Sequence, residues 1–439
     1  MYSPEISDLF KKLGINIGDS ILVSNESVKF EGILMPRPDI GNNNIIVIKR
    51  KDGYNVGIRY SGGTKVEKLE SRTNEILLPK LHAQANESLK TIHMLYTGGT
   101  IGSKVDYITG GVHVLTNPGE LLFEVPELQN IANINVKDIM HTFSEDMSHN
   151  EWSAIASEVF KSILDGADGV IITHGTDTMH YTAAALSFMI GGLNKPVVLT
   201  GAQRSSDRGS SDAFMNLICS AYVAQSDIAE VMICMHEDSS DKNCIAIRGT
   251  KARKMHTSRR DAFKPINNLP IARISYTGSI EKLSKYKKAN VDVELKLLNK
   301  FESRTALIKA YPNSDPSIID YYVKKGCKGI ILEGTGLGHL PIETKSNGYS
   351  WLSHVKDAIT SGVVVGITSQ CIYGRVDYKV YSAGRLLHES GAVYCEDMTP
   401  EVAYVKLGVL LGNYDSNKAK NMLNVDISGE ITERSEFDF

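Results

Sequence analysis

Between residues 91 and 275, short apolar runs rich in β-branched residues alternate with longer amphipathic stretches. The runs IHMLYT, GVIITH, PVVLT and EVMICMH have the length of buried strands, whereas EWSAIASEVFKSILD and DAFMNLICSAYVAQ have the apolar spacing of helices. Such regular alternation of strand and helix predicts an α/β domain with a parallel, doubly wound sheet that is covered by helices.

A second, smaller α/β domain is predicted over residues 305–439. There ALIKAYP, GIILEGTG and VVVGITSQ are typical of strands, and IIDYYVKKG and SWLSHVKDAITSG are typical of helices. Residues 276–304 lie between the two domains and are rich in lysine and poor in apolar side chains. We expect them to form an interdomain segment with one strand, VDVELKLL.

In the first part of the chain, residues 1–82, apolar and polar residues alternate with the short period of β-strands. INIGDSILVS, VKFEGILMP and NIIVIKRKDGYNVGI alternate as half-buried strands do, and Asp52-Gly53 is a typical hairpin turn. With LFKKLG as a short leading helix, this pattern predicts a small SH3-like β-barrel. Residues 83–90 are then a connector, and a further strand is possible in EILLP.

The composition indicates a soluble globular protein and excludes several classes. The chain has 439 residues, of which 42% are hydrophobic and 23% charged, and its net charge of −3 argues against wholesale coating of nucleic acid. No apolar run approaches the roughly 20 residues of a membrane helix, and the N-terminus lacks a signal-peptide core. The six cysteines show no CxxC spacing, so we expect no metal site and a cytoplasmic location.

Two threonine-bearing loops, TGGTIGS and HGTDT, directly follow predicted strands. They carry Thr97 and Thr100 in the first loop, and Thr176, Asp177 and Thr178 in the second. Because parallel strands end at one edge of a sheet, the two loops can face one pocket, and their glycines allow the backbone to approach a ligand. A threonine hydroxyl is a poor nucleophile without a base beside it. A lysine or histidine elsewhere in the chain is therefore needed.

These strings resemble the motifs of the asparaginase/glutaminase family, in the same order and at similar separations. The resemblance is carried by TGGTI, HGTDT and Lys254, the lysine nine residues before the FK of AFKP. It extends over roughly residues 90–415 through the further strings FSEDM, GAQRSSDRGSSDAFMNL, EGTGLGHLP, TSQC and EDMTPEVAYVKLGVLLG. The resemblance implies Thr100 as the first candidate nucleophile and Thr176 as the second essential hydroxyl. It implies Lys254 as the base or electrostatic activator and Asp177 as its orienting partner.

The same resemblance implies three substrate-binding residues. Ser144 would hold the α-carboxylate, Glu145 would contact the α-ammonium, and Tyr107 would be the mobile loop tyrosine. Purely structural roles for two of these motifs stay open: FSEDM can be a polar turn before a helix near Trp152, and HGTDT can cap the helix that follows it. Lys251 competes with Lys254, and His339 is either a site residue or a structural histidine.

The N-terminal module narrows the resemblance to the D-type chains of archaeal glutamyl-tRNA(Gln) amidotransferases. This family implies release of ammonia from glutamine or asparagine. A partner, the E-type amidotransferase subunit, would use ATP and Mg²⁺ to activate glutamate on tRNA(Gln), with two copies of each chain in a heterotetramer. This chain would then bind no cofactor itself and reach the tRNA mainly through the partner. Alternatives are a free-standing L-asparaginase and a catalytically inactive scaffold or tRNA-binding module.

A basic run follows residue 247. Seven Lys and Arg residues fall between Arg248 and Lys264, against one acid, Asp261. Such runs are usually solvated faces, and contact with tRNA phosphates is the alternative.

Overall fold

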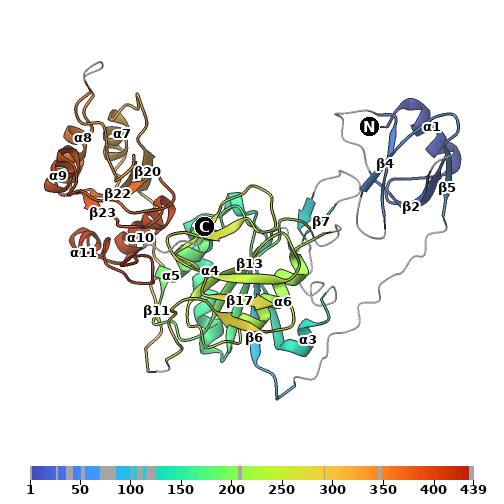
Figure 1. The fold of residues 1–439 in the computed structure, drawn as a ribbon, viewed down its shortest axis with the longest axis horizontal. Helices are drawn as coiled ribbons and strands as arrows, with labels where there is room; N and C mark the ends of the chain where they lie inside the picture. The colour runs from blue at the N-terminus through green and yellow to red at the C-terminus, as the bar shows by residue number, and fades with distance from the viewer. Residues whose placement is uncertain are drawn as a thin grey trace.

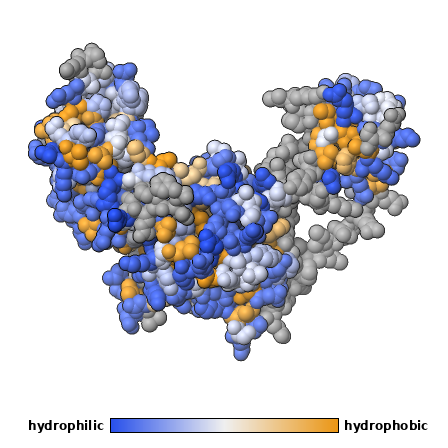
Figure 2. Space-filling model, in the orientation of Figure 1, coloured by the Kyte–Doolittle hydropathy of each residue, from blue (hydrophilic) through white to orange (hydrophobic). Residues whose placement is uncertain are grey.

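The chain folds into three units, an N-terminal β module and two α/β units (Figure 1). The structure is a computed structural model, and it describes residues 2–25, 28–35, 43–50, 55–69, 86–99, 101, 103–105, 112–114, 125–205, 210–290, 292–344 and 349–434. Within these ranges, no helix is long and apolar enough to cross a membrane. On the face seen in Figure 2, hydrophilic residues cover most of the surface of the two α/β units, and apolar residues form scattered patches.

The N-terminal unit is a five-stranded antiparallel sheet with one helix, as the short alternating runs predict. Helix α1 (Pro4–Leu13) begins with a Ser3 cap and ends at Gly14, whose φ of 62° suits glycine. The strands, in spatial order, are β4 (Asn55–Arg59), β3 (Ile45–Lys49), β2 (Lys29–Leu34), β1 (Ser20–Ser24) and β5 (Lys65–Lys68). Their inward side chains, among them Ile21 and Ile48, form a core with Ile6 and Phe10 of α1. The predicted Asp52-Gly53 turn and the EILLP strand lie outside the described residues.

The second unit is built on an eight-stranded sheet. In spatial order its strands are β18 (Ile280–Lys282), β17 (Ala272–Ser275), β14 (Asn243–Arg248), β13 (Val231–His236), β12 (Val197–Thr200), β10 (Gly169–Thr173), β6 (Thr91–Tyr96) and β9 (Asn133–Asp138). The five strands from β13 to β9 are parallel, as predicted, and β14, β17 and β18 extend the sheet antiparallel. The mixed edge arises because β13 returns through the short polar turn 237–242 instead of through a crossover helix.

Helices cover both faces of this sheet. Helices α3 (Leu128–Ile131) and α6 (Ala213–Val223) pack on one face, and α4 (His149–Leu164) and α5 (Met179–Met189) pack on the other. Strand β10 is buried along its whole length, as expected for a strand covered on both sides. Its carboxyl end leads into the HGTDT loop, which is thereby held on a rigid support.

The C-terminal unit is a smaller parallel α/β layer structure, as predicted. Its strands are β20 (Thr305–Lys309), β21 (Gly329–Gly334), β22 (Val364–Ser369) and β23 (Val393–Tyr394). Helices α7 (Ser317–Lys324), α8 (Trp351–Thr360) and α9 (Ser382–Glu389) lie on one face, and α10 (Pro400–Asn413) and α11 (Ser416–Met422) on the other. Successive side chains of β21 alternate accordingly, with Ile330 and Leu332 toward α8 and Ile331 toward α10.

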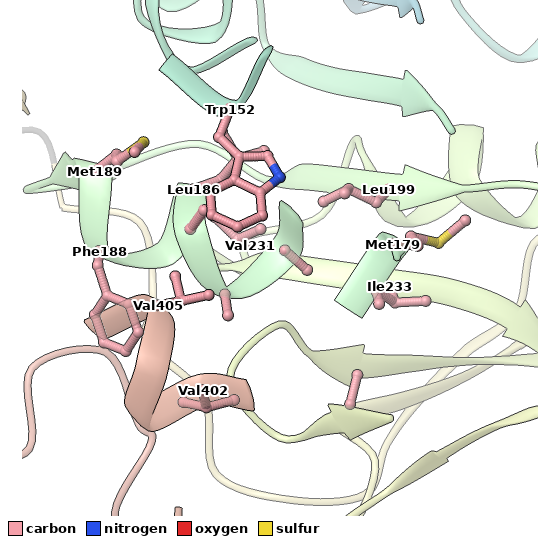
Figure 3. Close-up of a cluster of buried hydrophobic side chains, with 14 of the residues drawn as sticks. Trp152, Met179, Leu186, Phe188, Met189, Leu199, Val231, Ile233, Val402 and Val405 are labelled. Atoms are coloured by element: carbon pink, nitrogen blue, oxygen red, sulfur yellow. The ribbon is translucent and has the colours of Figure 1, made fainter. Parts of the chain in front are cut away.

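The two α/β units share one hydrophobic core. Figure 3 shows Leu186 and Phe188 of α5 in the same cluster as Val402 and Val405 of α10. Burial of this apolar surface fixes α10 against α5. Between the units, the expected strand VDVELKLL is reduced to β19 (Lys296–Leu297), which pairs with β11 (Ile190–Gly191).

Candidate active site

Glycines bring three loops of the second unit into direct contact. Gly98 has a φ of 108°, and a Cβ there would lie 2.8 Å from the Thr142 carbonyl oxygen. A Cβ on Gly99, whose φ is 84°, would overlap the backbone of Gly175. A Cβ on Gly175 would lie 2.7 Å from the Cβ of Ser144. Only glycine permits these approaches, so TGGTI, HGTDT and FSEDM meet at the carboxyl edge of the sheet.

Lys254 completes a cluster with two residues of the HGTDT loop. It ends β15 (Ala252–Lys254), which pairs with β16 (Phe263–Pro265) so that Lys254 lies opposite Phe263. Its Nζ donates hydrogen bonds to Thr176 Oγ1 at 2.9 Å and to Asp177 Oδ1 at 2.7 Å. The lysine side chain is 9% exposed and that of Asp177 65% exposed, so this cluster opens to solvent through the aspartate. Lys251, its competitor in the sequence, is turned away and pairs with Asp397.

The FSEDM segment forms the 3₁₀ turn η2 (Ser144–Asp146) beside that cluster. Ser144 is buried, and its Oγ accepts a hydrogen bond from the Asp177 N–H at 3.3 Å. Its carbonyl oxygen accepts the Thr178 hydroxyl at 2.5 Å. Thr178 precedes α5 but makes no side-chain cap, so its hydroxyl ties two loops together instead of capping the helix. Glu145 is exposed on the same turn.

Thr100 and Tyr107 lie outside the described residues, so the structure places neither of them. His339 lies in a turn of the C-terminal unit with its ring edge-on to Tyr381, at 5.0 Å between ring centres. Neither ring nitrogen has a hydrogen-bond partner among the described residues. Nothing in these contacts links His339 to the Lys254 cluster.

His174, the first residue of HGTDT, supports the site although its motif alone did not single it out. It is fully buried, with Nδ1 2.6 Å from the Gly175 carbonyl oxygen and Nε2 2.9 Å from the Thr182 hydroxyl. Burial lowers the pKa of His174 to about 4, so the ring is neutral at physiological pH. A neutral ring that donates through Nδ1 and accepts through Nε2 satisfies both contacts and fixes the loop that carries Thr176.

A second overlooked support is the carboxylate of Asp212, inside the GAQRSSDRGSSD string. It accepts the backbone N–H groups of Gln203 and Arg204 at 3.0 and 3.1 Å. Asn216 donates to Asp212 and to the Gly201 carbonyl oxygen. Burial raises the pKa of Asp212, and the backbone donors oppose that rise. This network fixes the loop after β12, and Gly201 of that loop lies close to His174 and Thr176.

The cations of the basic run after residue 247 are paired with carboxylates within the protein. Every one of its seven cations contacts a carboxylate: Arg248–Glu230, Lys251–Asp397, Arg253–Glu401, Lys254–Asp177, Arg259–Asp261, Arg260–Asp241 and Lys264–Asp261. The run is therefore a set of ion pairs, some of them buried, and these contacts explain it without a nucleic-acid partner. Among the described residues, no group of three or more His, Cys, Asp or Glu is arranged to hold a metal ion.

Replacement of Gly99 by alanine should disrupt the site, because the new Cβ would overlap the Gly175 backbone at a φ that disfavours alanine. We expect the amide hydrolysis that the sequence resemblance implies to fall at least about 100-fold, since displacements near 1 Å have effects of that order. Gly166→Ala is the matched control: its φ of 93° carries the same strain, but nothing lies within 4 Å of the added Cβ. Equal kcat/KM values in the Gly99 variant and the parent would contradict the close approach of the two loops.

Comparison with known proteins gives the same picture over the whole chain. Family models match in three places: Asparaginase, N-terminal over residues 91–287; Glutaminase/Asparaginase C-terminal domain over 304–423; and GatD N-terminal domain over 15–69. Among solved structures, the L-asparaginase of Thermococcus kodakarensis has a TM-score of 0.69 and 30% identity, and L-asparaginase I of Vibrio cholerae has 0.68 and 30%. Each covers 78% of this chain and is itself covered over 99% of its length.

Three curated relatives match over almost their full length, and each is named as the D chain of a glutamyl-tRNA(Gln) amidotransferase. The protein of Pyrococcus furiosus is 47% identical over 97% of both chains, and that of Pyrococcus abyssi 45% identical over 99% of both. The protein of Methanothermobacter thermautotrophicus is 43% identical over 99% of this chain and 98% of its own. The asparaginase-type units, the N-terminal module and these full-length matches together show that the chain belongs to the GatD family, the D-type chains of glutamyl-tRNA(Gln) amidotransferases.

Proposed function

We propose that this chain hydrolyses the side-chain amide of glutamine or asparagine and passes the ammonia to a partner chain that amidates glutamate on tRNA(Gln). The observation that carries the proposal is the contact of Lys254 with both Thr176 and Asp177, beside the glycine loop that leads to Thr100. A hydroxyl, an amine and a carboxylate in hydrogen-bond contact are the parts that nucleophilic amide hydrolysis needs.

In the proposed mechanism, Thr100 Oγ attacks the amide carbon, and backbone N–H groups at Gly99–Thr100 and near Thr176 stabilise the oxyanion. As Thr100 Oγ bonds to the carbon, its proton passes to Thr176 Oγ1 while the Thr176 hydroxyl proton moves to Lys254. The C–N bond then breaks, and the nitrogen takes a proton back through this relay and leaves as ammonia. Water cleaves the acyl-threonine ester, which releases the free acid and restores the Thr100 hydroxyl. Lys254, when neutral, can accept the Thr176 hydroxyl proton across 2.9 Å, and Asp177 stabilises the ammonium that results.

We assign substrate binding to Ser144, Glu145 and Tyr107. Ser144 is held against the N–H of Asp177, where a hydroxyl can donate to an α-carboxylate. Glu145 is exposed on the same turn and presents a carboxylate to an α-ammonium group. Tyr107 is assigned from the sequence resemblance alone.

The relatives' names as subunits imply partner subunits. We propose that the partner is the E-type chain, that two copies of each chain form a heterotetramer in the cytoplasm, and that glutamate-charged tRNA(Gln) binds mainly through the partner. ATP and Mg²⁺ are assigned to the partner, in line with the lack of a GxxxxGK[ST] string in this sequence. We also propose the division into a module over 1–82, a connector over 83–90, α/β domains over 91–275 and 305–439, and a linking segment over 276–304.

The alternative function is that of a free-standing L-asparaginase, which the likeness to solved asparaginases favours. That likeness, however, covers only 78% of the chain. The GatD N-terminal domain model matches residues 15–69, and an asparaginase function gives no reason for this module. Full-length similarity to the D-type chains therefore favours the amidotransferase role.

The test uses the complex with its partner chain and compares two nitrogen donors. With Thr176→Ala, conversion of Glu-tRNA(Gln) to Gln-tRNA(Gln) should fall at least about 100-fold with glutamine as donor, because the relay hydroxyl is gone. With ammonium chloride, conversion should stay within about twofold of the parent complex and should still need ATP. Failure of ammonium to support the variant would contradict the division of labour. Asparagine hydrolysis by the isolated chain, without any association with the partner, would favour the free-standing asparaginase.

A further inference from the structure

The strand that carries Lys254 presents charged side chains on both of its faces. Lys251, Arg253 and Lys254 follow one another closely along the chain, and the Ile266 N–H donates to the Lys251 carbonyl oxygen, which continues the ladder of β15 and β16. Side chains alternate between the faces of a strand, so Lys251 and Arg253 share one face. Lys254 occupies the opposite face, where it meets Thr176 and Asp177.

Both cations on the first face are held by the C-terminal unit. Lys251 Nζ lies 2.8 Å from Asp397 Oδ2, just before α10, and the two side chains are 2% and 0% exposed. Arg253 Nη2 lies 2.7 Å from Glu401 Oε1, in the first turn of α10. Since α10 is itself fixed against α5 by the shared core, these pairs connect the Lys254 strand to a rigid support.

Asp397 is further held by the C-terminal segment and by the loop after β16. The Thr432 N–H donates to its Oδ1 at 3.0 Å and the Thr432 hydroxyl to its Oδ2 at 2.5 Å. Asn267 Nδ2 donates to the Asp397 carbonyl oxygen at 3.0 Å. A carboxylate with this many donors has one orientation, and so does the lysine that it binds.

Stability alone does not account for such a pair. Removing two charges from water is costly, and a well-packed apolar pair in the same volume is often equally stable or more so. Burial accordingly lowers the pKa of Lys251, and the Asp397 carboxylate opposes that effect. What a buried pair provides and an apolar pair does not is a directional contact of fixed length.

We propose that Lys251 and Arg253, held by Asp397 and Glu401, are positioning residues that keep β15 in the register at which Lys254 reaches Thr176. The inference rests on the proposed role of Lys254 in amide hydrolysis. Through these two ion pairs, the C-terminal unit would fix the position of β15 and so influence the chemical step at Lys254. A shift of about 1 Å along β15 would break the 2.9 Å contact of Lys254 with Thr176, and effects near 100-fold follow from such shifts.

The main test is the double variant Lys251→Met with Asp397→Asn, which removes both charges of the buried pair and keeps an amide oxygen to accept the Thr432 N–H. We expect the thermal midpoint to stay near that of the parent and kcat for ammonia release to fall about 10- to 100-fold. KM should change less than about threefold, because Ser144 and Glu145 lie on another segment. A folded double variant with parental kcat, or one that changes KM alone, overturns the proposal.

Arg253→Gln and Glu401→Gln form the second test, since this pair is partly exposed and its loss is compatible with folding. Each should lower kcat about three- to tenfold, and parental kcat in both overturns the role of this pair even if the double variant fails to fold. Arg260→Gln is the matched control. Arg260 lies in the same hairpin but pairs with Asp241, so the kcat of this variant should equal that of the parent. If Lys254→Met itself leaves hydrolysis intact, the assignment of Lys254 has failed, and the inference that rests on it fails too. If the parent chain with its partner releases no ammonia from glutamine or asparagine, the proposed function has failed. If Lys254→Met is inactive but the Lys251/Asp397, Arg253 and Glu401 variants keep the parental kcat, the inference has failed and the proposed function stands.

Discussion

Lys254→Met is expected to lower kcat for ammonia release from glutamine or asparagine by about 100- to 10,000-fold. Methionine keeps the length of the buried stem but removes both hydrogen bonds, to Thr176 Oγ1 and to Asp177 Oδ1. The hydroxyl then has no proton acceptor, and the carboxylate has no cation to orient. The measurement is steady-state ammonia release, with circular dichroism to verify that the variant is folded.

Lys264→Met is the control for this variant, because it removes a cation from the paired strand β16 without a contact to the cluster. Its kcat should stay within about twofold of the parent. Thr100→Ala, Thr176→Ala and Asp177→Ala should each cause losses like that of the Lys254 variant, since residues that act as one unit have non-additive effects. Ammonia release at the parental rate by folded Lys254→Met would refute the assignment of this lysine.

Glu430→Gln is expected to lower the free energy of unfolding by about 3–5 kcal/mol, the usual effect of leaving one buried charge unpaired. Glu430 Oε1 lies 2.6 Å from Lys406 Nζ, and neither side chain is exposed. The carboxylate also accepts the N–H groups of Ile427 and Ser428, so it anchors the C-terminal segment to α10. Glutamine preserves the shape but leaves the Lys406 ammonium without its counter-charge. Denaturant titration followed by circular dichroism measures the change.

Two further variants separate the charge effect from packing. Lys406→Met combined with Glu430→Gln should recover most of the lost stability, because no unpaired charge remains and the glutamine oxygen can still accept the backbone N–H groups. Glu294→Gln breaks the exposed pair with Lys296 and should hardly move the unfolding midpoint. A Glu430→Gln protein as stable as the parent would show that Lys406 finds another partner or loses its proton.

Local pattern was informative wherever a short-range rule governs the structure. Apolar runs of strand length predicted β6, β10, β12 and β13, and a leading helix was expected where α1 lies. Strand-then-glycine loops identified the edge of the sheet at which Thr176 and Asp177 lie. The antiparallel strands β14, β17 and β18 were missed because the direction of a strand depends on the connection before it, and the polar turn 237–242 was not weighed as a hairpin.

The sequence by itself determined the order of elements and the residue types available to the site, because helical and strand periodicity, glycine turns and motif spacing act over a few residues. Only the tertiary structure decided how the lysines pair: Lys254 meets Thr176 and Asp177, whereas Lys251, three residues earlier, is buried against Asp397. The two residues are chemically identical, but Lys251 lies in the turn just before β15 and Lys254 at the end of that strand. The partner of Lys251 lies just before α10, and the position of α10 is fixed by its packing against α5, a contact between segments more than 200 residues apart that short-range patterns do not encode.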